Sequence, residues 1–152
     1  MPELSDLPPP PAVAGTSLGG TRIFSVSADE NARLCRSTGV EPAADGAAHP
    51  VWYYIATQVA MGKTVAGLCE TCEFDVDDGP MMGSSGVRFT APIMVDRDYN
   101  VTGEIVSLVR KRSRKLGVMD VLTYRLRLHP ASGGEAILET ENVWVLPRKE
   151  LA

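Results

Sequence analysis

The chain of 152 residues (16.3 kDa) has the length of one domain, and its 44% hydrophobic and 22% charged residues are typical of a folded protein. Its apolar runs are too short to span a bilayer, so we expect no membrane partner. The formal net charge of −4 argues against nucleic acid as a partner, because phosphate binding needs a surplus of Lys and Arg.

The first 13 residues contain four consecutive prolines, and they carry acidic side chains where a secretory signal would carry positive charge. We expect residues 1–13 to form a flexible, extended arm and residues 14–150 to form a single domain. The three cysteines make a poor disulfide framework, which fits a cytoplasmic protein.

The segment TRIFSVS (21–27) has the composition of a strand. Ser27 then begins the pattern S-A-D-E, in which the side chains of Ser27 and Glu30 can cap each other's backbone amides. This capping box predicts a helix over residues 28–38 that ends at Gly39, since glycine adopts the left-handed conformation of a helix end without strain.

After a loop expected at residues 41–50, the segment VWYYIATQVAMG (51–62) predicts a second helix. Pro50 suits a helix start, and only Thr57 and Gln58 interrupt an otherwise apolar surface. Such a helix is expected to be buried inside the protein.

Beyond this helix the hydrophobic period changes to two. Residues 122–129 alternate Leu or Tyr with polar side chains, as in a strand with one buried face. A central apolar helix and an antiparallel sheet to wrap around it predict the α+β class and the hot-dog fold, while a ferredoxin-like or other helix-on-sheet fold fits the same pattern. The other long strands are expected at 101–109 and 136–146, with hairpin turns at KRSRKLG (111–117) and PASGGE (130–135).

The segment GVRFTAPIMVDRDYNVTGEI (86–105) resembles the R-F-x-x-P motif region of the MaoC-like hydratases, a hot-dog family. Arg88, Phe89, Pro92 and Asp98 lie in that pattern. The resemblance continues in residues 14–39, 48–62 and 141–148, and it leaves out only the arm. It implies hydration or dehydration of an acyl thioester, on CoA or a carrier protein, without a cofactor and with paired hot-dog units.

The sequence departs from the family where catalytic members carry G-D-x-N-P-[LIV]-H, whose Asp and His activate a water. Val40 stands where the Asp would follow Gly39, and valine cannot act as a base. The loop that presents the His is also shortened. Asp45 and His49 are the one nearby pair that could act as acid and base. The alternative interpretation is structural: both residues belong to a solvated loop, and the His merely precedes a helix.

Three further groups of residues have a structural and a functional interpretation. Cys69 and Cys72 form a C-x-x-C motif without the further ligands of a zinc site, so two small buried side chains are the simpler interpretation and no metal is expected. The basic run around residues 110–115 is either a solvated turn or a phosphate site for CoA or a carrier arm. The candidate substrate-binding residues are Trp52, Tyr53, Arg88, Arg110, Lys111 and Arg112, of which the aromatic ones can equally belong to the core or a subunit interface.

Three hypotheses for function follow. The first is a non-catalytic, tunnel-shaping subunit of an acyl-thioester hydratase or dehydratase in fatty-acid, polyketide or steroid side-chain metabolism, whose partner supplies the Asp and His. The second is a homodimeric hydratase that uses Asp45 and His49. The third is a non-enzymatic acyl-thioester binder or assembly protein.

Overall fold

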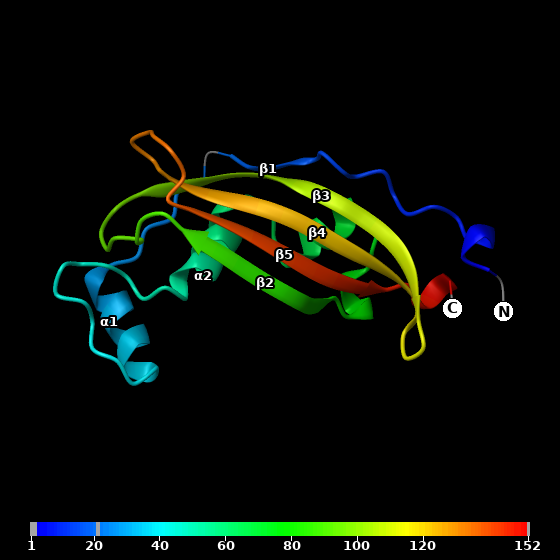
Figure 1. Ribbon diagram of the computed structural model, residues 1–152, viewed down its shortest axis with the longest axis horizontal. Coiled ribbons are helices and arrows are strands. Elements are labelled where there is room, and N and C mark those ends of the chain that lie inside the picture. Colours follow the sequence, from blue (N-terminus) through cyan, green and yellow to red (C-terminus); the bar gives the residue numbers. More distant parts are fainter. Residues whose placement is uncertain (1–2, 21, 152) are drawn as a thin grey trace.

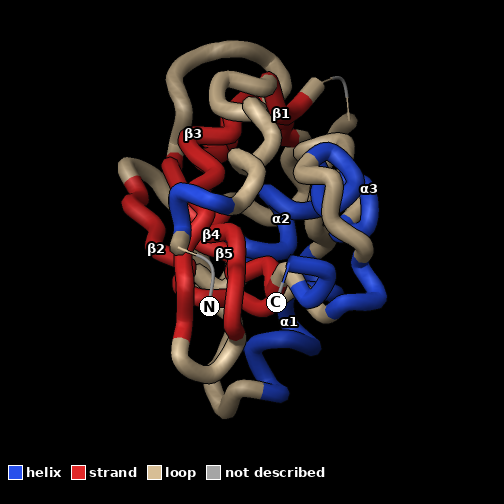
Figure 2. Tube along the Cα trace, turned by 90° about the vertical axis from the view of Figure 1, so that its right-hand side faces the viewer, coloured by secondary structure: helices blue, strands red, loops and turns tan. Residues whose placement is uncertain are grey.

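The computed structural model describes residues 3–20 and 22–151. One antiparallel sheet of five strands, in the order β1-β3-β4-β5-β2, forms one layer, and the helices lie on one side of it (Figures 1 and 2). This is the predicted α+β, hot-dog arrangement. The strands are β1 (Ser17–Gly19), β2 (Met81–Phe89), β3 (Tyr99–Ser113), β4 (Gly117–Pro130) and β5 (Leu138–Pro147), and the helices are α1 (Ala28–Ser37), α2 (Trp52–Ala60) and α3 (Val65–Thr71), with 3-10 turns at Leu4–Asp6, Val76–Asp78 and Lys149–Leu151.

Helix α1 begins as the sequence predicts. The Ser27 hydroxyl accepts a hydrogen bond from the Glu30 amide at 3.1 Å, and the Glu30 carboxylate accepts one from the Ser27 amide at 3.0 Å. Such a cap contributes about 1 kcal/mol to helix stability. The helix ends one residue before the predicted end, and Gly39 follows with φ of 80°.

The first strand is not where the sequence predicts it. The strand expected at 21–27 is replaced by β1, and within that range Phe24 makes only an isolated bridge to Tyr99, while Thr21 lies outside the described residues. Gly19 explains the early end of the strand. Its φ is 107°, and a Cβ there would lie 2.1 Å from the Val101 carbonyl oxygen, so the chain leaves the ladder at a position that suits only glycine.

Helix α2 exists as predicted but is not enclosed. Its buried residues are Ala56, Thr57 and Ala60, whereas Val51 at its N-cap and Val59 are 41% and 44% exposed. A single-layer sheet covers only one side of a helix, so the apolar opposite side of α2 stays accessible. The C-x-x-C segment that follows forms α3, a helix that the sequence analysis did not anticipate.

The core lies between α2 and the sheet, and the alternation in β4 is confirmed. Leu122, Tyr124, Leu126 and Leu128 are all fully buried. The hairpin turns fall where they were expected, between β3 and β4 and between β4 and β5. No helix in residues 3–20 and 22–151 combines the length and hydropathy needed to cross a membrane.

The two edges of the sheet differ. The edge at β3 is covered by β1 and the arm: Gly15 and Ile105 are joined by a backbone hydrogen bond of 2.8 Å, and the Arg110 guanidinium donates to the Pro8 carbonyl oxygen. The edge at β2 carries no further strand in the sheet order, and eight of its nine residues are exposed. The described chain therefore has one covered edge and one bare edge.

Candidate functional site

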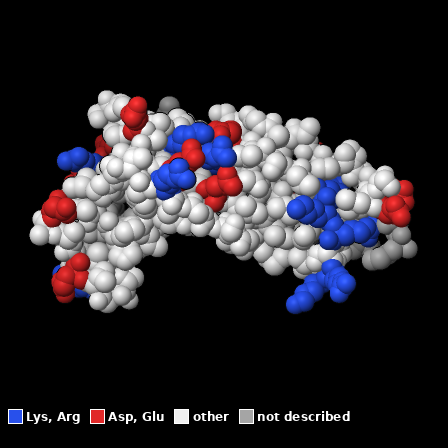
Figure 3. All heavy atoms as spheres, viewed as in Figure 1, with Lys and Arg blue, Asp and Glu red and all other residues white. Residues whose placement is uncertain are grey.

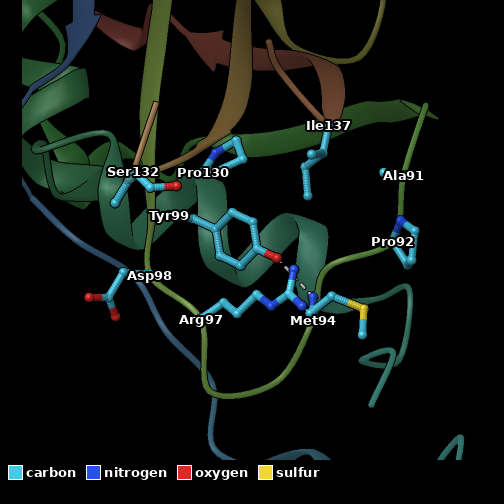
Figure 4. A pocket seen from close by; sticks show the side chains of 10 residues that line it. Ala91, Pro92, Met94, Arg97, Asp98, Tyr99, Pro130, Ser132 and Ile137 are labelled. Carbon is cyan, nitrogen blue, oxygen red and sulfur yellow. Dashed lines mark hydrogen bonds between the residues drawn. The ribbon is translucent and has the colours of Figure 1, made fainter. Parts of the chain in front are cut away.

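An apolar cleft of about 320 Å³ lies where the start of α2 approaches the end of β2. It shares Ala91 and Pro92 with a larger hollow of about 670 Å³ (Figure 4). The walls of the cleft are Ala48, Pro50, Phe89, Thr90, Ala91, Pro92 and Ile93.

The motif region 88–98 builds the hollow. The Tyr99 hydroxyl accepts a hydrogen bond of 2.9 Å from the Met94 amide, drawn as a dashed line in Figure 4, and so fixes the turn before β3. The Asp98 carbonyl oxygen accepts a hydrogen bond of 2.9 Å from the Ala131 amide, which ties this turn to the β4–β5 turn. Phe89, Pro92 and Asp98 thus line the site, while Arg88 is an exposed residue of the edge strand.

The loop that carries Asp45 and His49 is held against this turn. The Ala48 amide donates to the Ile93 carbonyl at 2.7 Å, and the Val95 amide donates to the Gly46 carbonyl at 2.9 Å. Ala48 and Pro50 both line the cleft, whereas His49 between them is not one of its lining residues.

The side chains of Asp45 and His49 both accept hydrogen bonds from backbone amides of their own turns. The Asp45 carboxylate accepts a hydrogen bond from the Ala47 amide at 2.9 Å, and His49 Nδ1 accepts one from the Val51 amide at 3.1 Å. Among the described residues the two side chains share no hydrogen bond. Their catalytic role stays a prediction. Val40, at the family's Asp position, is an exposed apolar residue.

Asn31, which the sequence analysis missed, binds the loop next to the cleft. Its side chain is 3% exposed, and its Oδ1 accepts hydrogen bonds from the His49 amide at 2.8 Å and the Trp52 indole at 3.1 Å. A polar residue four positions before Cys35, on the buried face of α1, is the signal that could have found it.

The two aromatic candidates have different neighbours at the start of α2. The Trp52 ring lies 6.1 Å from the Phe24 ring in addition to its bond to Asn31. The Tyr53 hydroxyl is 2.8 Å from Ser85 Oγ, and its ring lies 6.3 Å from that of Phe89. Tyr53 therefore faces β2, and Trp52 faces the loop of His49.

The basic candidates lie at the far end of the sheet. Arg110, with its side chain 8% exposed, pairs with Asp120 at 2.8 Å. Lys111 and Arg112 precede the β3–β4 turn, about 40 Å along β3 from Tyr99 at roughly 3.3 Å per residue. Figure 3 shows Lys and Arg gathered over this hairpin end. The structure does not bring them to the cleft of the same chain, and their role stays a prediction, as does that of Arg88.

The C-x-x-C motif fits the structural interpretation. Both thiols are fully buried, and burial raises the pKa of Cys69 and raises that of Cys72 to about 11. A neutral buried thiol is a poor nucleophile and a poor metal ligand. The described part of the chain contains no group of three or more His, Cys, Asp or Glu able to hold a metal ion.

Solved structures share this fold. A chain of the HadBC (3R)-hydroxyacyl-ACP dehydratase complex from Mycobacterium tuberculosis matches with a TM-score of 0.63 and 16% identity, over 89% of this chain and 98% of that chain. A MaoC-like dehydratase from Rhodospirillum rubrum matches with a TM-score of 0.63 and 14% identity, over 96% and 97%. A chain of the ChsH1–ChsH2 complex from M. tuberculosis matches with a TM-score of 0.62 and 12% identity, over 85% and 80%.

In sequence comparisons, no family model and no curated protein matches the chain. The structural likeness establishes that the chain has the hot-dog fold seen in MaoC-like dehydratases, as the resemblance of its motifs implied.

Proposed function

We propose that the chain is a subunit of a MaoC-like acyl-thioester hydratase or dehydratase, in which a second hot-dog subunit supplies the catalytic Asp and His. The observation that carries this proposal is the bare edge strand β2, which ends at the apolar cleft. An exposed edge of nine residues is a template for strand pairing, and natural proteins seldom leave such an edge open. Two of the solved neighbours come from complexes of two differently named subunits, HadBC and ChsH1–ChsH2.

The residues around the cleft favour a supporting role for this chain over a catalytic one. Hydration requires one group to take a proton from water as its oxygen bonds to the β carbon, and a proton must then reach the α carbon. Val40 provides neither function, and Asp45 and His49 share no hydrogen bond within the described chain. The partner is therefore expected to bear the family motif G-D-x-N-P-[LIV]-H.

Two-fold pairing gives the basic hairpin a role. If β2 pairs antiparallel with the edge of a hot-dog partner, the Met81 end of this strand lies opposite the partner's cleft end. The β3–β4 turn is at that same end of this chain. Lys111 and Arg112 would then attract the phosphates of a CoA or carrier arm that enters the partner's cleft, not the cleft of this chain.

The test is an enoyl-thioester hydration assay of the chain alone, of the pair, and of the pair with Asp45→Asn and His49→Ala in this chain. We expect little turnover by the chain alone, and turnover by the pair that survives the two substitutions. The control is the partner alone, which separates rescue by this chain from activity that the partner already has.

A second candidate, a self-sufficient homodimeric hydratase, is favoured by one observation, the place of His49 in the chain between two residues that line the cleft. Turnover by the lone chain that is abolished by His49→Ala would support it and contradict the first proposal. Binding of a thioester without turnover in any combination would leave the non-enzymatic binder.

A further inference from the structure

Two rows of charged side chains cross the exposed face of the sheet toward the bare edge at β2. Across β4, β5 and β2, the rows are Arg127–Glu139–Arg88 and Arg125–Glu141–Gly86. In each row the first two members form an ion pair, at 3.0 Å in the first row and 2.9 Å in the second. Figure 3 shows opposite charges gathered over the strands of this face. The sign of the charge alternates along both rows until they reach β2.

Both rows are incomplete at the edge. Arg88 is exposed, and among residues 3–20 and 22–151 its side chain forms no ion pair, because the Glu139 carboxylate is already shared by two other arginines. Glu141 is 49% exposed, and its neighbour Gly86 has no side chain. A Cβ at Gly86 would meet nothing within 4 Å. The edge therefore presents a cation without a partner and a carboxylate that can be approached across a glycine.

The backbone of β2 limits how a further strand can pair with this edge. The Thr90 amide donates to the Ile137 carbonyl of the chain that leads into β5, at 2.8 Å. Because backbone hydrogen bonds alternate along an antiparallel ladder, the amide and carbonyl of Val87 point toward the open edge. Two copies of the chain related by a two-fold axis can therefore exchange two backbone hydrogen bonds between their Val87 residues.

The charges select this register over its neighbours. With the axis at Val87, Arg88 lies opposite Gly86 of the second copy, and Glu141 of that copy lies one strand further, about 10 Å away at about 4.8 Å per strand. An extended arginine and a glutamate span this distance, and the symmetry forms the contact twice. An axis one residue later would oppose the two arginines. An axis one residue earlier would place Arg88 opposite Ser84, whose neighbour on β5 is apolar.

The inner face of the edge fits the same register. Phe89 would lie opposite Ser85 of the second copy. Within one chain, the Tyr53 hydroxyl is 2.8 Å from Ser85 Oγ, and the rings of Tyr53 and Phe89 are 6.3 Å apart. The pairing would therefore bring Phe89 of one copy toward Tyr53 of the other, so aromatic rings would line both sides of the axis.

We propose that, without its catalytic partner, the chain pairs with a second copy through β2 about an axis at Val87, and that Arg88 and Glu141 of the two copies fix the register. Arg88 then serves subunit pairing and not substrate binding. The inference goes beyond the proposed function, since it concerns the chain alone. A catalytic partner would take the place of the second copy at the same edge.

The register is tested by disulfide formation. Across the axis the two α-carbons at position 87 would be about 5.5 Å apart, within the range of a disulfide, so Val87→Cys should give a covalent dimer on mild oxidation. The three native cysteines are buried and should not contribute. Ser85→Cys on the same strand and Val106→Cys on β3 are the controls and should stay monomeric on a denaturing gel. Cross-linking of Ser85→Cys in place of Val87→Cys would overturn the proposed register.

The charges are tested by sedimentation of the full chain over a range of concentrations. Arg88→Glu and Glu141→Lys should each raise the dissociation constant of the homodimer by about three to ten times, and the double variant should restore it. Arg33→Glu, a charge reversal at an exposed position of α1, should leave it unchanged. Arg88→Gln gives the same direction should a charge reversal fail to fold.

Two results would overturn the inference: a chain that is monomeric at every concentration, and a double variant as weak as the single ones. The proposed function is read out separately, by turnover of the pair with the catalytic partner. An active pair formed by a chain that is monomeric alone would reject the homodimer and leave the proposed function standing. A homodimer with this register and no active pair would do the reverse.

Discussion

Single residues decide how the cleft is held, and Asn31 is the clearest case. One carbonyl oxygen accepts hydrogen bonds from the backbone of His49 and from the indole of Trp52. These two residues belong to the loop before α2 and to the first turn of α2. Asn31 therefore couples α1 to the loop that lines the cleft and to the start of α2, and no alternation in the sequence reports such a contact.

Asn31→Ala should lower the free energy of unfolding by about 1–3 kcal/mol, because it leaves the partly buried His49 amide and Trp52 indole without their acceptor. Urea denaturation followed by circular dichroism measures the change. Arg33→Ala, at an exposed position of the same helix, is the matched control and should stay within about 0.5 kcal/mol. Equal losses in the two variants would contradict the role given to Asn31.

Glu104 is expected to titrate below the ordinary range of a glutamate. The bidentate hydrogen bonds from Arg127, at 3.0 and 3.1 Å, lower its pKa, and burial opposes them only in part. A lowered folded-state pKa gives stability that is present above the unfolded pKa and is lost as pH falls through the folded one. NMR titration should show the Glu104 midpoint rising in Arg127→Gln, and rising less in Arg125→Gln, whose contact is 3.9 Å. An unchanged midpoint in Arg127→Gln would refute this.

At the scale of elements, a buried ion network joins parts of the chain that are far apart in sequence. Asp120 on β4 is fully buried between Arg110 of β3, at 2.8 Å, and Arg148 after β5, at 2.7 Å. Arg148 also donates to the carbonyl oxygens of Cys72 and Glu73, at the end of α3. The network therefore fastens α3 and the C-terminal segment to the sheet.

Asp120→Ala should destabilise the protein by about 3–5 kcal/mol, since it leaves two buried arginines without their carboxylate. Glu139→Ala is the control, because Glu139 pairs with Arg125 and Arg127 on the exposed face of the sheet and should cost at most about 1 kcal/mol. Thermal unfolding of the two variants compares them directly. A smaller loss in Asp120→Ala than in Glu139→Ala would show that the network is not structural.

The sequence predicts elements wherever the pattern is local. Ser27 and Glu30 mark the start of α1, and the alternation in β4 matches its burial. The sequence does not predict elements whose bounds depend on contacts between residues far apart in the chain. A strand was expected around Phe24, but the close approach of Gly19 to β3 ends the ladder before it.

The candidate site was predicted only in part, for the same reason. Phe89, Pro92 and Asp98 could be found because they form a motif in consecutive sequence. The hydrogen bond between Gln58 and Tyr124 forms only when α2 packs on the sheet. The sequence shows Arg110 and Asp120 as ordinary charges of a strand, and only the pairing of β3 with β4 makes them a buried pair.

At the scale of the whole molecule, one edge of the sheet is covered and the other is bare. The proline-rich arm and β1 cover β3, and proline has no amide hydrogen with which to pair a further strand. The edge at β2 lacks the prolines and the interrupting charges that usually protect edges, apart from Arg88 near its end. This asymmetry supports the proposal that the chain associates through β2 and the exposed side of α2.

Association through β2 can be tested without knowing the partner's sequence in advance. We expect the purified chain to form a complex, with its partner or with a second copy, and Val87→Lys to shift it toward the 16.3 kDa monomer, because a lysine at a sheet edge opposes strand pairing. Size-exclusion chromatography with light scattering gives the mass.

Val106→Lys on β3 is a closely matched control, since Val106 is 38% exposed and Val87 is 37% exposed. The circular dichroism spectrum of each variant must show that the fold persists. If Val106→Lys dissociated the complex and Val87→Lys did not, the interface would lie at the other edge, and the placement of the partner's cleft beside Met81 would fall with it.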